Sequence, residues 1–487
     1  MRRPRVRFGA AAGARRSDAD RAIDALRARL GLPETFASAA MAEASDAARG
    51  HGGDDPARRD RRDVPLVTLD PAGSRDLDQA FAIDERPGGG MRLWYAIADV
   101  AAFVRPGGAL ENETLERGVT YYGPDRRTPL HPTILSEGAA SLLAGAERPA
   151  VLWALDVDGD GELTDIGVER ATVRSRAALD YRSTQAAIDD GSASANVARL
   201  VELGRRRREL AARRGAVELE VPTQEVVEDP TGRGYVLRYD AQLPVEGWNA
   251  QLSLLCGMAA ARLQQDAGIG LLRTLPPPSD ELVAELRRAA AALGVEWAPE
   301  VGYAARVREL DGSVPAEAAL LSSAARLFRG AGYVAFTDGA PDGAEHSAIA
   351  APYAHVTAPL RRVADRYATE VALAAAVGSA PPAWAVERLE ALPEVMATAR
   401  QRESELDRAT IDIVEALVLA GREGARFEAV VLRSYRDGGA LLQLRDPAVI
   451  ARADEGTWPL GEVVEAVLTT ADVGEGEVRF GPVTADG

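Results

Sequence analysis

Three aspartates stand close together in the segment TLDPAGSRDLDQA, at Asp70, Asp76 and Asp78. Asp70 ends an apolar run that predicts a buried strand, and a turn containing proline and glycine separates it from the other two. Residues two apart in extended backbone face the same side, so Asp76 and Asp78 should point together. Mg²⁺ prefers such oxygen ligands, and a metal held there can activate water in phosphoryl chemistry. A solvated, aspartate-rich turn is the competing interpretation.

A pair of arginines stands in the segment YAHVTAPLRRVADR. Pro359 suits the first turn of a helix, which we predict over residues 359–376, and this puts Arg361 and Arg362 at the helix N-terminus. The helix dipole disfavours positive charge there, so an anionic partner is indicated. Guanidinium groups match the oxygens of a phosphate, although a carboxylate elsewhere in the fold would serve equally well.

Two tyrosines precede a second pair of arginines in the segment GVTYYGPDRRTPLHP. The tyrosines could stack on bases and Arg126 and Arg127 could bind phosphate, a combination typical of single-stranded nucleic-acid binding. Tyrosines of the hydrophobic core are the simpler interpretation. The four histidines show no zinc-binding spacing, and Cys256 is the only cysteine, so a multi-cysteine zinc site is excluded.

The composition limits the classes of function. The 487 residues are enough for about three domains. The absence of lysine excludes chemistry that needs its amine, such as pyridoxal Schiff bases. A net charge of −17 argues against a generally basic nucleic-acid binder but not against a local basic channel. The single cysteine and the lack of an apolar run of about 18 residues predict a cytoplasmic protein that does not span a membrane.

The hydrophobic pattern divides the chain into three parts. Residues 1–62 are weakly patterned, with a short helix expected over residues 18–32 and a linker over residues 51–63. Residues 63–420 mix strand and helix patterns, whereas residues 421–487 show short alternating runs that predict an antiparallel barrel of about five strands. We therefore expect an α+β fold, a mixed sheet with surrounding helices followed by a small OB-like barrel. Beyond residues 359–376, helices are expected over residues 184–215, 247–265, 280–293, 316–328 and 385–420.

A glycine–aspartate run at residues 158–161 predicts the turn of a strand hairpin. The run resembles the start of a calcium-binding loop. The twelfth position of such a loop would be Gly167 instead of glutamate, and the flanking residues read as strands, so the hairpin turn is the favoured interpretation.

Taken in order, these segments resemble the catalytic RNB domain of the ribonuclease II family. TLDPAGSRDLDQAFAI is similar to the family's strand-and-aspartate signature, and LWYAIADVAAFV is similar to the strand that follows it. ERGVTYYGPDRRTPLHPTILSEGAASLL is similar to its RG-x-x-x-Y-x-P block, and YAHVTAPLRRVADR to its Y-x-H-x-TSPIRRY block. The resemblance runs from about residue 63 to residue 420, which is most of the chain.

The resemblance implies a processive, hydrolytic 3′→5′ exoribonuclease that degrades single-stranded RNA to nucleoside 5′-monophosphates with Mg²⁺. Asp70, Asp76 and Asp78 match three of the family's four metal-site aspartates, and Asp76 and Asp78 are also expected to act in catalysis. Arg361 matches the arginine that stabilises the transition state. We expect a monomer. The residues expected to contact RNA are Tyr122, Tyr181, Glu246, Arg362 and Asp407.

The chain departs from the family pattern at the fourth metal-site position, where Gln79 stands in place of an aspartate. An amide lacks the charge of a carboxylate, so we expect one cation site to be weakened and activity to need more Mg²⁺ or to prefer Mn²⁺. The family's N-terminal cold-shock domains do not fit in residues 1–62. Two other functions stay open: an RNB-like fold that binds RNA without cutting it, and an acidic scaffold protein.

Overall fold

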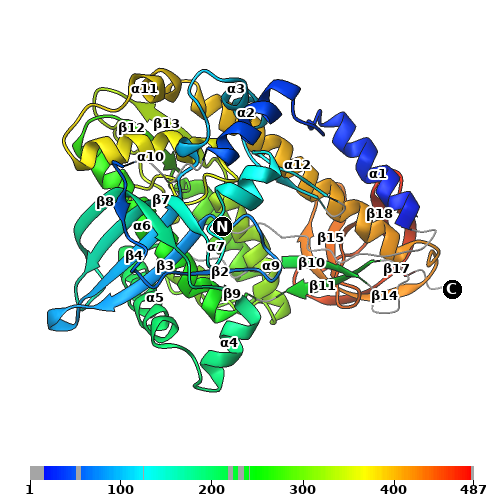
Figure 1. Ribbon diagram of the computed structural model, residues 1–487. Coiled ribbons are helices and arrows are strands. Elements are labelled where there is room, and N and C mark those ends of the chain that lie inside the picture. Colours follow the sequence, from blue (N-terminus) through cyan, green and yellow to red (C-terminus); the bar gives the residue numbers. More distant parts are fainter. Residues whose placement is uncertain are drawn as a thin grey trace.

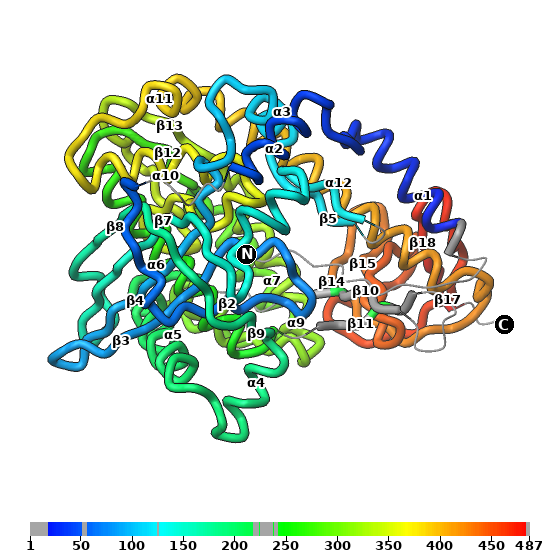
Figure 2. Tube along the Cα trace, in the orientation of Figure 1, coloured from blue at the N-terminus to red at the C-terminus, as the bar shows by residue number. Residues whose placement is uncertain are grey.

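Two bodies make up the protein in the computed structural model, which describes residues 16–50, 56–123, 126–217, 223–228, 235–240 and 242–483. The first body is a mixed sheet surrounded by helices, and the second is a β-barrel near the C-terminus, orange to red in Figure 1. Helix α12 (Leu392–Leu419) runs from the first body toward the second, as the tube in Figure 2 also shows. The α+β class expected from the sequence is confirmed.

The central sheet has seven strands in the order β1-β8-β7-β4-β3-β2-β9. Neighbouring strands are antiparallel, except that β1 runs parallel to β8 and β2 runs parallel to β9. In chain order the strands are β1 (Arg59–Asp60), β2 (Val67–Asp70), β3 (Gln79–Glu85), β4 (Met91–Ala98), β7 (Glu147–Val157), β8 (Leu163–Arg174) and β9 (Ala177–Asp180).

Helices cover the sheet and connect it to the barrel (Figure 1). Helix α6 packs against β4, β7 and β8, α5 packs against α6 and β3, and α10 packs against α6 and β8. In chain order the helices are α1 (Arg16–Arg29), α2 (Ser38–Arg49), α3 (Ala109–Arg117), α4 (Tyr181–Asp189), α5 (Ala195–Arg214), α6 (Pro244–Asp266), α7 (Asp280–Ala292), α8 (Tyr303–Arg308), α9 (Pro315–Ala324), α10 (Val363–Ala376), α11 (Ala383–Leu389) and α12, with short helical turns at η1 (Pro87–Gly89), η2 (Val100–Ala102), η3 (Leu135–Ala139) and η4 (Ala325–Phe328).

Strands β3 and β4 are buried on both faces, which explains their nearly continuous apolar sequence. Successive side chains of a strand alternate between the faces. Phe81 and Tyr95 therefore pack into the cluster that contains α6, whereas Ala80 and Ala82 pack into a second cluster that also contains Leu360. The sheet thus supports, on its alanine face, the segment that carries the paired arginines.

The C-terminal strands form a closed barrel in the order β14-β15-β16-β18-β17, so the expected barrel of five strands is confirmed. It differs from the antiparallel expectation at one pair, because β16 and β18 are parallel. Phe427 and Phe480 meet edge to face in its interior, with ring centroids 5.8 Å apart. The barrel strands are β14 (Arg426–Ser434), β15 (Ala440–Leu444), β16 (Ile450–Ala453), β17 (Val463–Asp472) and β18 (Glu477–Pro482). Paired strands elsewhere are β5 (Tyr121–Tyr122) with β6 (Arg127–Thr128), β10 (Thr223–Glu228) with β11 (Tyr235–Asp240), and β12 (Gly270–Thr274) with β13 (Gly332–Phe336).

Helices α1 and α2 dock on the first body. Arg27 of α1 is buried and donates to the Thr128 hydroxyl and the Arg126 carbonyl, both in or beside hairpin β5–β6. Glu43 of α2 accepts two backbone N–H groups at the start of α3. The helix expected over residues 18–32 is therefore present as α1, and a second helix follows it.

The charged stretch expected as a linker contributes to the sheet. Residues 51–55 lie outside the described part of the chain, but Arg59 and Asp60 form β1. Arg58 is buried in an ion pair with Asp99, with Nη2 2.6 Å from Oδ2. That partner lies 41 residues further along the chain, so the local sequence gave no sign of it.

Several elements differ in their boundaries from the expectation. Helix α10 begins at Val363 instead of Pro359, because Arg362 pairs with Val119 in an isolated β-bridge and the preceding residues form a turn. The helices expected over residues 184–215 and 385–420 are each divided in two, as α4 with α5 and α11 with α12. The hairpin at residues 158–161 is confirmed, because β7 and β8 pair and Asp158 accepts backbone N–H groups in the turn.

Helix α6 is the central helix of the first body, and its buried face contains Cys256, which is fully buried and free. Burial raises the pKa of the Cys256 thiol well above its ordinary value. Across the described ranges, no helix combines the length and apolar character that a membrane crossing requires.

Candidate functional site

Asp78 is a buried carboxylate bound at both oxygens. It directly precedes β3, and its side chain is 6% exposed. Oδ1 accepts the Leu360 N–H at 2.8 Å, and Oδ2 lies 3.3 Å from Nε of Arg361. Burial raises the pKa of Asp78 to about 8, against the lowering effects of Arg361 and the Leu360 N–H. The structure thus brings together Asp78 and Arg361, which come from separate segments of the sequence.

Asp76 lies close enough to Asp78 to contribute to the raised pKa of the Asp78 carboxyl. Oδ2 of Asp76 accepts the Tyr122 hydroxyl at 3.0 Å, and Oδ1 accepts Nη1 of Arg127 at 3.1 Å. Both donors come from hairpin β5–β6, where Tyr122 and Arg127 are directly opposite each other. The second arginine pair of the sequence therefore supplies one partner for the acidic cluster.

The two tyrosines of this hairpin lie in different surroundings. Tyr121 is fully buried, and its hydroxyl donates to the Arg117 carbonyl. Tyr122 is 42% exposed beside Asp76. The core interpretation therefore holds for Tyr121, whereas Tyr122 presents a ring to solvent next to the aspartates. Arg126 forms ion pairs with acidic residues of the N-terminal segment.

Asp70 ends β2 and stands opposite Asp180 in the parallel pair β2–β9. Asp180 caps helix α4 by accepting an N–H of its first turn at 3.0 Å, and this sets Tyr181 as the first helical residue. The Tyr181 hydroxyl accepts Nδ2 of Asn249 at 3.1 Å, and the same nitrogen contacts the carbonyl of the residue before Asp70. Tyr181 therefore lies beside the end of the strand that carries Asp70. The negative charge of Asp70 contributes to raising the pKa of Arg361.

Arg362 points in a different direction from Arg361. It donates to both carboxylate oxygens of Asp365, at 2.9 and 2.8 Å. Asp365 is fully buried and also accepts the Ala358 N–H at 2.7 Å. This is the arginine–carboxylate pair that the sequence left open, and contact of Arg362 with RNA stays a prediction.

Glu246 and Asp407 lie on long helices. Glu246 is in the first turn of α6, where the helix dipole favours an acidic residue. Asp407 is half-buried on α12. Glu403 lies one turn earlier on the same face of α12, and it adds to the effect of burial in raising the pKa of Tyr121 and Tyr333. The sequence patterns did not indicate Glu403, and the contacts of Glu246 and Asp407 with RNA stay predictions.

The oxygen donors of Asp70, Asp76 and Asp78 suit a hard divalent cation in kind. Within the described ranges, no group of three or more histidine, cysteine or acidic side chains converges closely enough to hold a metal ion by itself. Mg²⁺ usually keeps several waters and is bound by one or two carboxylates together with substrate phosphates. The donor set therefore fits Mg²⁺ or Mn²⁺ that is bound together with a phosphate-containing substrate.

Gln79 is hydrogen-bonded at both ends of its amide. Nε2 donates to the Thr357 carbonyl at 2.6 Å. Oε1 accepts the Tyr95 hydroxyl at 2.6 Å and the Ser253 hydroxyl at 3.2 Å. The sequence predicted Gln79 only as a replacement for a metal ligand. It did not predict these hydrogen bonds, because the partner residues lie in other segments of the chain.

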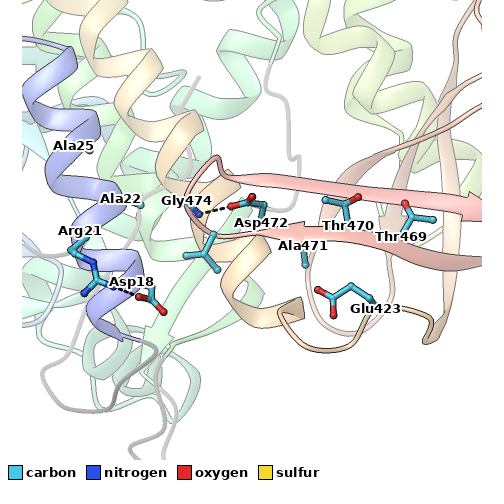
Figure 3. Close-up of a pocket in the computed structure, with 11 residues that line it drawn as sticks. Asp18, Arg21, Ala22, Ala25, Glu423, Thr469, Thr470, Ala471, Asp472 and Gly474 are labelled. Carbon is cyan, nitrogen blue, oxygen red and sulfur yellow. Dashed lines mark hydrogen bonds and ion pairs between the residues drawn. The ribbon is translucent and has the colours of Figure 1, made fainter.

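One cavity of about 720 Å³ lies away from these residues, between helix α1 and hairpin β17–β18 (Figure 3). Arg21 in its wall pairs with Asp18, and Asp472 accepts the Gly474 N–H at 2.8 Å. The predicted site residues do not line this cavity, so it is separate from the candidate site.

The chain belongs to the RNB domain family. The family model described as RNB domain matches residues 58–376. The family model described as RNase II-type exonuclease C-terminal S1 domain matches residues 425–483, which contain the barrel. The resemblance to the ribonuclease II family that the sequence blocks indicated is confirmed.

Curated relatives include nucleases of plants and bacteria. The exosome complex exonuclease RRP44 homolog A of Arabidopsis thaliana is 31% identical over 338 residues, which cover 66% of this chain and 36% of that protein. Ribonuclease R of Vibrio cholerae is 30% identical over 327 residues, which cover 63% of this chain and 38% of that protein. The chain thus spans well under half the length of these curated relatives.

Solved structures share the fold. Mycoplasma genitalium RNase R in complex with ribose-methylated single-stranded RNA matches with a TM-score of 0.84 and 17% identity, over 96% of this chain and 78% of that one. Yeast Ssd1, described as a pseudonuclease, matches with a TM-score of 0.67 and 15% identity, over 92% of this chain and 56% of that one. Nucleases and a pseudonuclease therefore have this fold in common.

Proposed function

We propose that this protein is a divalent-metal-dependent 3′→5′ exoribonuclease that hydrolyses single-stranded RNA to nucleoside 5′-monophosphates. The observation that carries the proposal is the contact between Asp78 and Arg361. Burying a carboxylate costs free energy unless its charge is compensated, and Arg361 supplies the opposite charge. The side chain of Arg361 is nevertheless 34% exposed. An accessible arginine beside a buried carboxylate can also bind a phosphate, and membership of the RNB domain family supports the same conclusion.

Hydrolysis requires a water molecule to attack the terminal phosphodiester and the 3′-oxygen of the remaining chain to leave with a proton. Asp78 binds Arg361 through Nε and so orients the guanidinium. The guanidinium can then donate to the phosphoryl oxygens as negative charge develops on them. Asp70, Asp76 and Asp78 would hold the cation, which when bound polarises the phosphate and lowers the pKa of water.

We propose single-stranded RNA as the partner of the exposed Tyr122 ring. Its hydroxyl is fixed on Asp76, so the ring is held ready for stacking on a base. Tyr181 lies near Asp70, which supports a role next to the terminal ribose. We further propose that Glu246, Arg362 and Asp407 line the same path and that the protein is a cytoplasmic monomer. We propose the domains expected from the sequence, residues 1–62, 63–420 and 421–487, with strand β1 assigned to the second because it pairs with β8.

RNA binding without cleavage is the second candidate function. Gln79 in place of the fourth aspartate favours it, as does the shared fold of a protein described as a pseudonuclease. The retention of the three aspartates together with Arg361 argues against it, because a protein that only binds RNA has no need of this combination.

Incubation of 5′-labelled single-stranded RNA with Mg²⁺, Mn²⁺ or EDTA separates the two functions. The proposed exoribonuclease shortens the labelled RNA stepwise with metal and leaves it intact in EDTA. A protein that only binds RNA retards it in a gel and leaves its length unchanged. If the labelled 5′ nucleotide is instead released at the start of the reaction, the enzyme degrades from the 5′ end, and the proposed 3′→5′ direction is wrong.

A further inference from the structure

Gln79 joins three elements to the turn that carries Arg361. It begins β3, and its amide oxygen accepts hydroxyls from Tyr95 on β4 and Ser253 on α6. Its amide nitrogen donates to the carbonyl of Thr357. Because a carbonyl can only accept, the nitrogen end of the amide must face Thr357, and this fixes the orientation of the whole group.

An aspartate at this position could not make the same contacts. An ionised carboxylate has no proton to donate, so its oxygen would meet the Thr357 carbonyl without a hydrogen bond. The aspartate side chain is also one methylene shorter. Leaving the buried Thr357 carbonyl unsatisfied costs free energy, so an amide suits this chain where a carboxylate does not.

The rest of the turn at residues 357–362 is held in the same way. The Arg361 carbonyl accepts the Thr120 N–H at 3.0 Å. The Pro359 carbonyl lies 3.1 Å from Nε2 of His131, which is buried, so this nitrogen must carry the proton. Together with the bonds from Asp78 and Asp365 described above, side chains from separate segments bind the backbone on both sides of Arg361.

We propose that Gln79, assisted by His131, is a positioning residue that fixes this turn and thereby the guanidinium of Arg361, and that it is not a weakened metal ligand. The effect on the turn follows from the hydrogen bonds alone. The effect on catalysis rests on the proposed function, because a displacement of about 1 Å in a reacting group can slow a reaction on the order of 10²-fold.

Hydrogen–deuterium exchange of the full chain tests the effect on the turn without RNA. Gln264 provides the control, since its amide is also bound at both ends. Nε2 of Gln264 donates to the Ala368 carbonyl at 3.1 Å, and Oε1 accepts the Leu271 N–H at 2.8 Å. We expect Gln79→Met to speed exchange in the peptide covering residues 358–363 by about tenfold, equivalent to one lost hydrogen bond. Gln264→Met should leave that peptide unchanged. Unchanged exchange in Gln79→Met overturns the proposal.

Mn²⁺ binding separates a positioning residue from a metal ligand. The electron paramagnetic resonance signal of free Mn²⁺ is followed in the presence of single-stranded RNA with a terminal phosphorothioate linkage. We expect Gln79→Met to bind Mn²⁺ within about twofold of the unmodified protein, because the substitution leaves the charge of the aspartates intact. We expect Gln79→Asp to bind no additional ion. An additional ion in Gln79→Asp, or a loss of Mn²⁺ affinity in Gln79→Met, would assign Gln79 to the metal site.

Steady-state kinetics then connect the turn to catalysis. Both Gln79 variants should lower kcat by about tenfold or more and leave KM for RNA nearly unchanged, because the orientation of Arg361 is lost and RNA binding is not. If the unmodified protein does not cleave RNA, the proposed function fails and the exchange experiment still decides on the turn. If the Gln79 variants do not fold, His131→Leu gives the same test, and His131→Gln, which keeps an N–H donor, should restore slow exchange.

Discussion

Asp78 offers a carboxylate that a bound cation would keep ionised, and it also accepts an N–H group. Asparagine at this position keeps only the second property. The amide oxygen of Asp78→Asn can still accept the Leu360 N–H, so the turn is retained. The charge beside Arg361 is lost, and we expect kcat to fall on the order of 10²-fold or more. RNA affinity should be preserved, because the lost interaction belongs to the transition state. Single-turnover cleavage and filter binding on one preparation measure both quantities.

Asp84→Asn is the matched control for Asp78→Asn. Asp84 lies on β3 and accepts Nε1 of Trp94 at 2.8 Å, a bond that the asparagine oxygen can also accept. This variant should cleave RNA at the normal rate. Near-normal turnover by a folded Asp78→Asn protein would show that Asp78 has no role in catalysis.

Lysine at position 361 tests whether more than a positive charge is needed there. Arg361→Lys keeps the charge but lacks the planar fork that can donate to two phosphoryl oxygens. We expect kcat to fall on the order of 10²-fold. Arg92→Lys is the control, since Arg92 makes a two-bond pair with Asp156 on strands β4 and β7. Full activity of Arg361→Lys would mean that the charge alone suffices.

Helix α12 and the barrel are joined by a buried carboxylate, and this junction is expected to depend on pH. Oε1 of Glu415 accepts the Ile450 N–H at 2.7 Å and Nε2 of Gln224 at 2.5 Å. Burial raises the pKa of Glu415 from 4.5 to about 8, although both hydrogen bonds lower it. Between these two values the folded chain keeps a proton that the unfolded chain releases. Raising the pH through this range therefore costs stability.

Glu415→Gln should remove this loss of stability. Its amide oxygen can accept the same two donors, and it carries no charge at any pH. We expect the Tm of the variant relative to the unmodified protein to rise between pH 5 and pH 8, by an amount on the order of a few degrees. Thermal unfolding followed by circular dichroism at both pH values measures the difference. An equal Tm difference at both pH values would contradict the raised pKa.

The elements that the sequence predicted are those whose signals are local. The five-stranded barrel and hairpin β7–β8 follow from alternation between turn residues, and α7 follows from helical periodicity. The start of α10 was placed at Pro359 because the residue suits a first turn. The helix starts at Val363, since Arg362 is extended and pairs with Val119, a residue far away in the sequence. Tertiary contacts of this kind leave no mark on the neighbouring sequence.

The candidate site was predictable to a similar extent. The resemblance of sequence blocks selected Asp78 and Arg361, and the structure brings them within 3.3 Å. The hydrogen bonds of Gln79 were not predictable, because Thr357 and Ser253 are chemically ordinary residues that only the fold brings together. The partners of buried arginines were not predictable either, because Asp99, which binds Arg58, and Thr128, which binds Arg27, are brought close only by the fold.

At the scale of the whole molecule, the proposed path should admit one strand only. The exposed Tyr122 ring can stack on an unpaired base, whereas bases of an A-form duplex are stacked on each other and withdrawn. We expect the protein to digest a single-stranded 3′ tail and to stop before a stable hairpin. RNA affinity should decrease as salt increases, because phosphate contacts release counterions. Smooth digestion of a blunt duplex would contradict this expectation.

Helix α1 contacts both the hairpin of the candidate site and the region of the barrel. Arg27 on α1 holds Thr128 of hairpin β5–β6, the hairpin whose Tyr122 binds Asp76. Helix α1 also packs against α12 and borders the barrel hairpin β17–β18. A segment that looked weakly patterned in sequence is thus part of the support of the tyrosine hairpin.

The burial of Cys256 gives this protein an internal reporter of its own opening. A thiol-reactive label can reach the only cysteine when α6 leaves the core, so the rate of labelling under native conditions measures how often that happens. Each molecule gains one adduct or none, and a mass spectrum therefore reads directly as the fraction of chains that have opened. A ligand that binds only the closed form slows the labelling in proportion to its occupancy. Affinity for RNA or for a metal ion can be measured in this way even with a variant that has lost all catalytic activity.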